Sequence, residues 1–178
     1  MPTVETIARD GEAMMDLLKE DYKRYSQKKR MPRYQYHYRK ASQSSWRLIK
    51  IYHLIMLRIT RQRYLCDFPA GVKIGGGLFI NHPYCITIHP DVVMGEHISL
   101  QKGITIGQEN RGKRQGVPTI GNNVCICPNA IIVGKISVGN DVLIAPGAYV
   151  NCDIPDHSIV IGNPCVIHYR ENATEGYL

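Results

Sequence analysis

In Ile120-Gly-Asn-Asn-Val-Cys-Ile126-Cys-Pro-Asn-Ala-Ile-Ile132-Val-Gly-Lys-Ile-Ser-Val138, every sixth residue is Ile or Val. A period of six fits neither the 3.6-residue period of an α-helix nor the alternation of strands joined by hairpins. It fits a chain that forms one flat β face per six residues, so that three faces complete a triangular coil of about 18 residues. The stretch therefore predicts a mainly β protein built as a parallel β-helix of hexapeptide repeats.

The same period extends through most of the C-terminal two thirds of the chain. We expect each periodic residue to point inward, and the coils to stack so that each buries the apolar edge of the next. These twelve residues are called the hexad ladder: Ile74, Ile80, Ile86, Val92, Ile98, Ile104, Ile120, Ile126, Ile132, Val138, Ile144 and Val150.

One interval breaks the hexad ladder. Ile104 and Ile120 are 16 residues apart, which is not a multiple of six, and the interval contains the polar, glycine-rich run Gln108-Glu-Asn-Arg-Gly-Lys-Arg-Gln-Gly116. Such a segment cannot pack into an apolar core, and loops longer than about 12 residues in compact domains are usually functional or disordered. We expect a loop over residues 107–119 to protrude from the β-helix; a tolerated surface insertion is the alternative.

The charge of the chain is concentrated in its N-terminal third. The 178 residues are 44% hydrophobic with a net charge of +7, which fits one domain with an appendage. Between Tyr22 and Cys66 there are thirteen Lys or Arg and no Asp or Glu, so the basic excess belongs to this segment alone. We expect a basic helical segment over residues 1–66, the β-helix over 67–170 and a tail over 171–178.

Two parts of the basic segment have the pattern of α-helices. Residues Thr6 to Lys29 combine strong helix formers with apolar positions at helical spacing, whereas Arg30 to Ser45 is rich in tyrosine and basic residues. A second helix is expected from Trp46 to Ile59, apolar on most of its surface and too short to span a bilayer. It can pack against the preceding helix or another subunit, or lie on an anionic membrane surface.

Several classes of protein are disfavoured by composition. The six cysteines have neither a paired zinc spacing nor the density of a secreted scaffold, and we expect no metal. Residues 1–19 contain acids where a signal peptide needs an apolar run, so we expect a cytoplasmic protein, with peripheral association at the inner membrane face as a further expectation. The basic segment matches no recognition motif for nucleic acid. The histidines His89, His97 and His157 are expected at ordinary surface turns.

His82 is the candidate for chemistry. It follows the inward Ile80 by two residues, on the alternating frame that normally holds another apolar side chain, so it needs a partner or a role. Asp67 lies fifteen residues upstream, nearly one coil below. A carboxylate beside an imidazole fixes its tautomer and stabilises its protonated form during general-base catalysis. From spacing alone, a purely structural role for His82 stays open.

From about Asp67 to His168 the sequence resembles the hexapeptide-repeat acyltransferases, and most specifically their serine acetyltransferase-like branch. Besides Asp67, the resemblance is carried by Lys73-Ile-Gly-Gly-Gly-Leu-Phe-Ile-Asn-His82, Ile98-Ser-Leu-Gln-Lys-Gly-Ile-Thr-Ile-Gly107, Pro118-Thr-Ile-Gly121 and Gly162-Asn-Pro-Cys165. It implies a left-handed β-helix, a homotrimer with acetyl-CoA bound along the groove between protomers, and a catalytic pair at Asp67 and His82.

The resemblance also implies direct acetyl transfer without an acyl-enzyme. His82 would take the proton from the acceptor hydroxyl as this hydroxyl attacks the thioester, with Asp67 supporting the imidazolium. Gly107 and Gln108, where the loop departs, and Arg114 within it are the expected contacts of acetyl-CoA, because glycine permits close backbone approach. Two further positions of the expected slot hold Pro128 and Pro146.

The acceptor is less well specified, because the chain departs from the serine enzymes in two places. Asn81 replaces the acid that precedes the catalytic histidine there, and Gln115-Gly-Val-Pro118 replaces an Arg-His pair before the proline. We expect Asn81 and Arg111 to contact an acceptor that is a saccharide of surface polysaccharide synthesis, whose phosphates the basic segment would attract. The alternatives are serine O-acetylation in cysteine synthesis and a non-catalytic scaffold.

Overall fold

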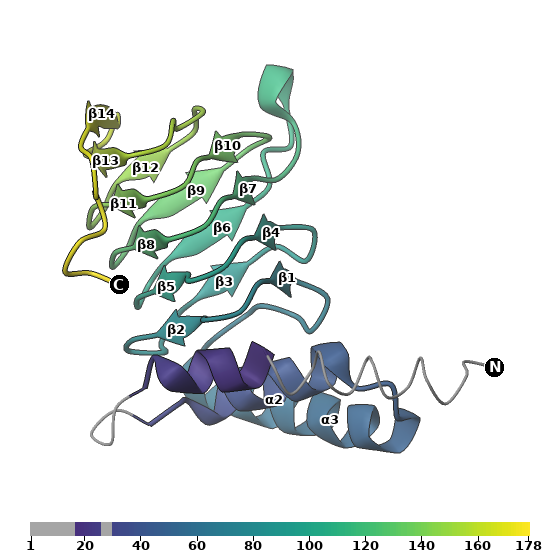
Figure 1. Cartoon of the computed structure of the whole chain (residues 1–178). Helices are drawn as coiled ribbons and strands as arrows, with labels where there is room; N and C mark the ends of the chain where they lie inside the picture. Colours follow the sequence, from purple (N-terminus) through teal and green to yellow (C-terminus); the bar gives the residue numbers. More distant parts are fainter. Residues whose placement is uncertain (1–16, 26–29) are drawn as a thin grey trace.

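A computed structural model describes residues 17–25 and 30–178, which form a helical segment followed by a β-helix (Figure 1). Residues 17–23 are helical, and two longer helices follow, α2 (Arg33–Gln43) and α3 (Arg47–Tyr64). The strands are β1 (Lys73–Ile74), β2 (Phe79–Ile80), β3 (Thr87–Ile88), β4 (Val93–Met94), β5 (Ser99–Leu100), β6 (Thr105–Gly107), β7 (Thr119–Ile120), β8 (Val124–Ile126), β9 (Ile131–Val133), β10 (Ser137–Val138), β11 (Val142–Ile144), β12 (Tyr149–Val150), β13 (Ser158–Ile161) and β14 (Val166–Tyr169).

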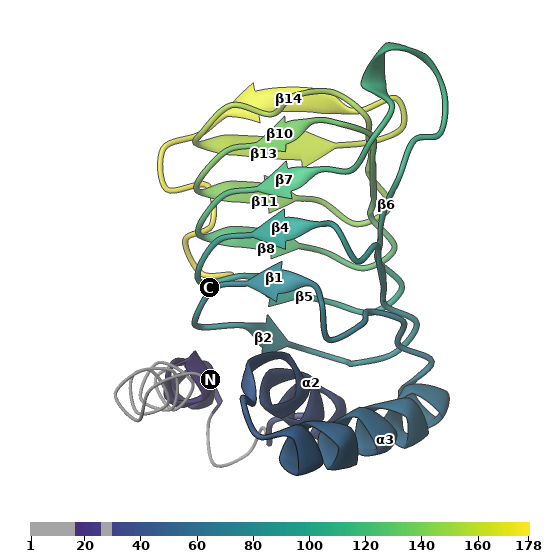
Figure 2. The ribbon, with the colours of Figure 1, turned by 90° about the vertical axis from the view of Figure 1, so that its right-hand side faces the viewer.

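The strands form the three faces of the predicted parallel β-helix. One sheet has the order β1-β4-β7-β10, a second β12-β9-β6-β3, and the third β14-β13-β11-β8-β5-β2. All pairings between these strands are parallel except that of β13 with β14, which is antiparallel and lies at the end of the coil stack farthest from the helices (Figure 2). The first coil carries β1 and β2, which are edge strands next to the helical segment.

The hexad ladder is buried throughout, as predicted. Its twelve side chains are between 0% and 6% exposed and belong to one continuous hydrophobic cluster. This burial explains why the period is so regular: each position faces the same narrow interior, which β-branched residues fill well.

The hexad ladder is nevertheless not one continuous stack. Ile80 lies opposite Leu100, 20 positions later, whereas Ile88 lies opposite Ile106, 18 positions later. The corner between Ile80 and Ile88 therefore contains two more residues than an ordinary corner. After this corner, the buried residues of the strands lie two positions after the ladder residues. They form a second inward series: Ile88, Met94, Leu100 and Ile106.

A second and larger insertion follows β6. Strand β6 ends at Gly107 and β7 begins at Thr119, and between them the chain projects from the β-helix with a short 3₁₀ turn, η1 (Gly112–Arg114), at its tip (Figure 2). Backbone hydrogen bonds in both directions between Glu109 and Gly116, at 2.9 and 3.0 Å, close the base of this loop. The loop is thus an ordered hairpin-like excursion from one corner.

The helices differ from the sequence-based expectation. Helix α3 runs five residues past the expected end at Ile59. Helix α2 was not predicted, because its buried face mixes tyrosines with polar Gln35, His37 and Arg39 and so has no purely apolar stripe. Of the first predicted helix, residues 17–23 are helical and residues 24–25 are not; the rest lies outside the described residues.

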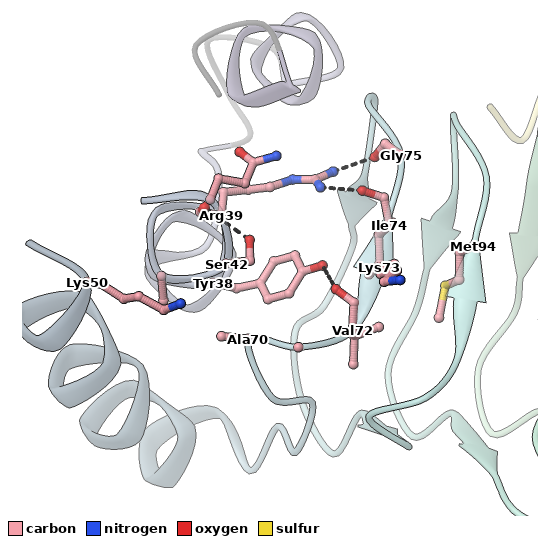
Figure 3. A pocket seen from close by; sticks show the side chains of 13 residues that line it. Tyr38, Arg39, Ser42, Lys50, Ala70, Val72, Lys73, Ile74, Gly75 and Met94 are labelled. Atoms are coloured by element: carbon pink, nitrogen blue, oxygen red, sulfur yellow. Dashed lines mark hydrogen bonds between the residues drawn. The ribbon is translucent and has the colours of Figure 1, made fainter. Parts of the chain in front are cut away.

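A buried ion pair attaches the helices to the first coil. The Arg39 guanidinium donates two hydrogen bonds to the Asp21 carboxylate, at 2.7 and 2.9 Å, and both residues are 1% exposed or less. Arg39 also donates to the carbonyls of Ile74 and Gly75 at 2.6 Å each (Figure 3), while the amide of Leu78 donates to Asp21 at 2.8 Å. The pair therefore satisfies backbone groups at the open edge of the β-helix.

Buried tyrosines of α2 extend this cap. The Tyr34 hydroxyl donates to the carbonyl of Phe68 at 2.8 Å, and the Tyr38 hydroxyl donates to that of Val72 at 2.7 Å (Figure 3). Burial raises the pKa of both phenols, so they remain protonated donors at neutral pH. A cavity of about 600 Å³ lies beside this contact, between α2, α3 and β1.

Helix α3 packs on α2 with only a narrow part of its surface. Its buried residues are His53, Leu57 and Thr60, and no helix within residues 17–25 and 30–178 is long and apolar enough to cross a membrane. Large apolar side chains remain exposed along α3: Leu48, Ile49, Ile51, Leu54, Ile55 and Ile59. Exposed apolar patches of this kind mark interaction surfaces.

Replacing the buried arginine tests the cap. Arg39→Met should lower the free energy of unfolding by about 3 to 5 kcal/mol, because it leaves the Asp21 carboxylate buried without its partner. Chemical denaturation followed by circular dichroism measures the change. Arg47→Met, at an exposed position of α3, is the control, and a loss below about 1 kcal/mol for Arg39→Met would contradict this role of the pair.

Candidate active site

His82 lies in the expanded corner after β2. Its backbone has a φ of +60°, and its carbonyl accepts a hydrogen bond from the amide of Tyr84 at 2.7 Å. The preceding Asn81 is half-buried and donates its amide to the carbonyl of Leu100 at 2.9 Å. The β ladder therefore ends at Asn81, and the chain turns at His82.

The expectation that His82 occupies the inward frame is wrong. Its side chain is exposed, whereas Ile88, two residues after the ladder residue Ile86, is buried as that frame requires. The left-handed backbone at His82, which histidine adopts more readily than most residues, interrupts the alternation of side chains. The imidazole is thus presented to solvent and has no hydrogen-bond partner within the described part of the chain.

Asp67 is held one coil below, at the entrance to the β-helix. Its amide donates to the carbonyl of Ile86 at 2.6 Å, and its carbonyl accepts from the amide of Ile88 at 2.9 Å. Its carboxylate forms an ion pair with Arg61 of α3 at 2.7 Å, with both side chains about half exposed. Exposed ion pairs contribute about 0 to 1 kcal/mol, so this one can exchange partners at little cost. The catalytic pair of Asp67 with His82 stays a prediction, since Arg61 is the partner of this carboxylate in the structure.

The residues expected to bind acetyl-CoA lie near the two ends of the strands of one sheet. Gly107 is at the carboxyl end of β6, opposite Val133 of β9, with Gln108 exposed beyond it. Pro128 and Pro146 lie one coil apart, before the amino-terminal ends of β9 and β12. The amide of Gly147 donates to the carbonyl of Pro128 at 2.9 Å. The predicted contacts therefore flank the sheet formed by β12, β9, β6 and β3.

Arg114 and Arg111 have different surroundings in the protruding loop. The Arg114 guanidinium donates to the carbonyl of Asn151, and its own carbonyl accepts from the amide of Lys135 at 2.8 Å. These contacts hold the loop against later coils of the same protomer. Arg111 is exposed, with its amide 3.3 Å from the Glu109 carboxylate. Neither arginine forms a hydrogen bond or ion pair with Asn81 or His82 within the described chain.

A second pair of aspartate and histidine lies at the C-terminal end. The Asp141 carboxylate accepts hydrogen bonds from His157 Nδ1 at 2.8 Å, from the amides of Ala173 and Thr174 at 2.9 and 3.0 Å, and from the Thr174 hydroxyl at 2.6 Å. Although burial opposes it, hydrogen bonds from Thr174 and His157 lower the pKa of Asp141 to about 2. The sequence placed His157 in a simple turn and gave no sign of this partner. Three of the four bonds reach residues 173–174, so the pair clamps the C-terminal segment.

Among residues 17–25 and 30–178, no three His, Cys, Asp or Glu side chains are arranged to hold a metal ion.

Comparison with known proteins yields serine acetyltransferases. No protein-family model matches the chain. The serine acetyltransferase of Helicobacter pylori is 37% identical over 97 residues, covering 54% of this chain and 57% of the relative; that of Staphylococcus aureus is 35% identical over 100 residues, covering 55% and 46%. The chain spans about half the length of the curated relatives that it matches.

Solved structures agree with these relatives. Serine acetyltransferase from Brucella abortus has a TM-score of 0.74 at 22% identity, covering 96% of this chain and 73% of that structure. A serine acetyltransferase in complex with CoA has a TM-score of 0.74 at 20% identity, covering 92% and 73%. The predicted resemblance to the serine acetyltransferase-like branch is confirmed. The predicted fold, a left-handed parallel β-helix with a short helical N-terminal segment, is confirmed as well.

The expected saccharide acceptor is wrong. The relatives and structural neighbours described above are named serine acetyltransferases, so they support the serine alternative instead. The saccharide interpretation depended on Asn81, on the run Gln115 to Pro118 and on the basic N-terminal charge. Two short departures and a net charge are weak grounds against an identity that extends over about a hundred residues.

The clamp on the C-terminal segment gives a pH-dependent prediction. Because the pKa of Asp141 is lowered to about 2, its clamp should be complete above about pH 4 and be lost as the pH falls toward 2. Asp141→Asn should loosen the segment at neutral pH, since an amide nitrogen cannot accept from the donors of residues 173–174. Hydrogen exchange of the Ala173 and Thr174 amides measures both effects. Asp91→Asn, at an exposed turn, is the control, and unchanged exchange in Asp141→Asn would rule out the clamp.

Proposed function

We propose that this protein transfers the acetyl group of acetyl-CoA to the hydroxyl of L-serine. The observation that carries the proposal is the 37% identity over 97 residues to the serine acetyltransferase of Helicobacter pylori. Two structural neighbours add support, one a serine acetyltransferase in complex with CoA and the other the Neisseria gonorrhoeae enzyme in complex with serine. The exposed imidazole of His82 suits a group that must meet a substrate from solution.

His82 acts as the general base in the proposed reaction. Its imidazole removes the proton of the serine hydroxyl while the hydroxyl oxygen bonds to the thioester carbonyl carbon. The tetrahedral intermediate collapses with cleavage of the carbon–sulfur bond, and the proton passes from the imidazolium to the leaving thiolate. The products are O-acetylserine and CoA, and no acyl-enzyme forms. Asp67 stabilises the imidazolium once its carboxylate has exchanged Arg61 for His82.

Removing the proposed base tests the reaction. Thiol release from acetyl-CoA in the presence of L-serine should fall about 10²- to 10⁴-fold in kcat/KM for His82→Ala, because a general base contributes a factor of this size. His168→Ala is the matched control. His168 is exposed on β14, the edge strand of the six-stranded sheet that lies farthest from β2 and the His82 corner. Serine-independent thiol release, or full activity of His82→Ala, would refute the proposal.

We also propose that acetyl-CoA binds between the protomers of a homotrimer. The proposal is supported by the family resemblance. It is also supported by the position of Gly107, Pro128 and Pro146 near the strand ends of one sheet, where a second β-helix can complete a groove. Multi-angle light scattering should give three times the mass of the chain, or six times if α3 joins two trimers. A monomer at micromolar concentration would contradict it.

Two expectations for α3 remain predictions. Its exposed apolar side chains would be buried in either, by packing against another subunit or by lying on an anionic membrane surface, which its basic residues favour electrostatically.

A further inference from the structure

A cavity of about 710 Å³ lies against the corner that carries the candidate base, although the side chain of His82 is not part of its lining. Its walls come from the segment that leads into α2, the C-terminal half of α3, strand β2 and the expanded corner that follows β2. Asn81 and Pro83, the two neighbours of His82 in the chain, both line it. The volume falls in the usual range of small-molecule sites and admits an amino acid with its surrounding water.

The cavity carries a concentrated positive charge. Arg30, Arg33 and Arg63 line it, all three are exposed, and none of them forms an ion pair with the described residues. Among residues 17–25 and 30–178, no Asp or Glu lines it. By contrast, the nearby Arg61 is paired with Asp67. These three guanidinium groups are therefore available to bind an anion.

Apart from Thr60 and Asn81, the remaining walls are apolar or aromatic. Met56 and Ile59 come from α3, while Phe79 and Tyr84 come from the coil. A low-polarity wall next to a cation strengthens its attraction for an anion, because fewer water molecules screen the pair. The planar guanidinium group of arginine also matches a carboxylate with two parallel hydrogen bonds.

The arginines of the protruding loop are less suited to this task. Arg114 is bound to the carbonyl of Asn151, on a coil well after β2, and the base of the loop is closed by the Glu109 to Gly116 hydrogen bonds. Arg33 and Arg63, in contrast, face the same cavity as Asn81. In serine, three bonds separate the hydroxyl oxygen from the carboxyl carbon. A cation that binds the carboxylate must therefore lie close to the base that meets the hydroxyl.

We propose that this cavity is the acceptor subsite, in which Arg33 and Arg63 hold the acceptor's carboxylate while its hydroxyl faces His82. The inference rests on the proposed function and specifies which residues recognise the acceptor. The amide oxygen of Asn81 accepts a hydrogen bond from the acceptor's ammonium group. The N-terminal helices thereby supply the selectivity for an α-amino acid, and the β-helix supplies the base.

Substitution of the two arginines tests the subsite. Arg33→Gln and Arg63→Gln should each raise the KM for L-serine about ten- to a hundredfold, with kcat within a few fold and the KM for acetyl-CoA unchanged, because a charge-assisted contact to the ground state is lost. Arg63→Lys should recover part of the loss. Arg58→Gln is the matched control, since Arg58 is exposed on the same helix and does not line the cavity.

A substrate without the carboxylate gives an independent readout. Wild type should prefer L-serine to L-serinamide, and the double variant Arg33→Gln/Arg63→Gln should lose this preference, with its fold checked by circular dichroism. If wild type acetylates serine but the variants match Arg58→Gln, the subsite is overturned while the proposed function stands. If wild type releases no thiol with serine, the proposed function fails and the subsite fails with it.

Discussion

The buried ion pair of Asp21 with Arg39 is the contact on which the N-terminal half of the structure depends. A parallel β-helix has an open edge at its first coil, where carbonyl and amide groups have no neighbouring strand. Arg39 covers two of these carbonyls, Asp21 covers the amide of Leu78, and Gln35 donates to the carbonyl of Leu78 at 2.8 Å while bonding to Asp21 at 2.9 Å. Each guanidinium nitrogen and each carboxylate oxygen of the pair has a hydrogen-bond partner, which is the condition under which buried charges are tolerated.

The cap also fixes the position of the candidate active site. Strand β2 is an edge strand, and the amide of Ile80 donates to the Tyr25 hydroxyl at 2.8 Å, which in turn donates to Gln35 at 2.6 Å. Burial raises the pKa of Tyr25, so this hydroxyl keeps its proton. The corner that carries His82 begins one residue after Ile80. The helices therefore hold the strand from which the candidate base departs, and α3 also supplies Arg61 to Asp67.

The sequence predicted what depends on a repeated environment and missed what depends on a single contact. The hexad ladder could be predicted because each position faces the same interior. Helix α2 could not, because polar Gln35, His37 and Arg39 share its buried face with Tyr34, Tyr38 and Ala41. Gln35 and Arg39 hydrogen-bond to backbone groups of the coil, an environment that no apolar pattern predicts. The outward imidazole of His82 was missed for a related reason. The sequence period does not reveal the two extra residues in its corner, because the second inward series has the same period of six as the hexad ladder.

The N-terminal charge shows why a count of basic residues does not identify a ligand. Read as a total, thirteen Lys or Arg without an acid favoured a phosphate-bearing saccharide. In the structure these residues have separate surroundings: Arg39 is buried against Asp21, Arg24 donates to the carbonyl of Gly77 at 2.8 Å, and Arg61 is paired with Asp67. Only a few arginines face the cavity beside His82, a number suited to one carboxylate instead of an extended polyanion. Charge acts on a ligand through the positions of individual guanidinium groups, and the fold of α2 and α3 over the first coil sets those positions.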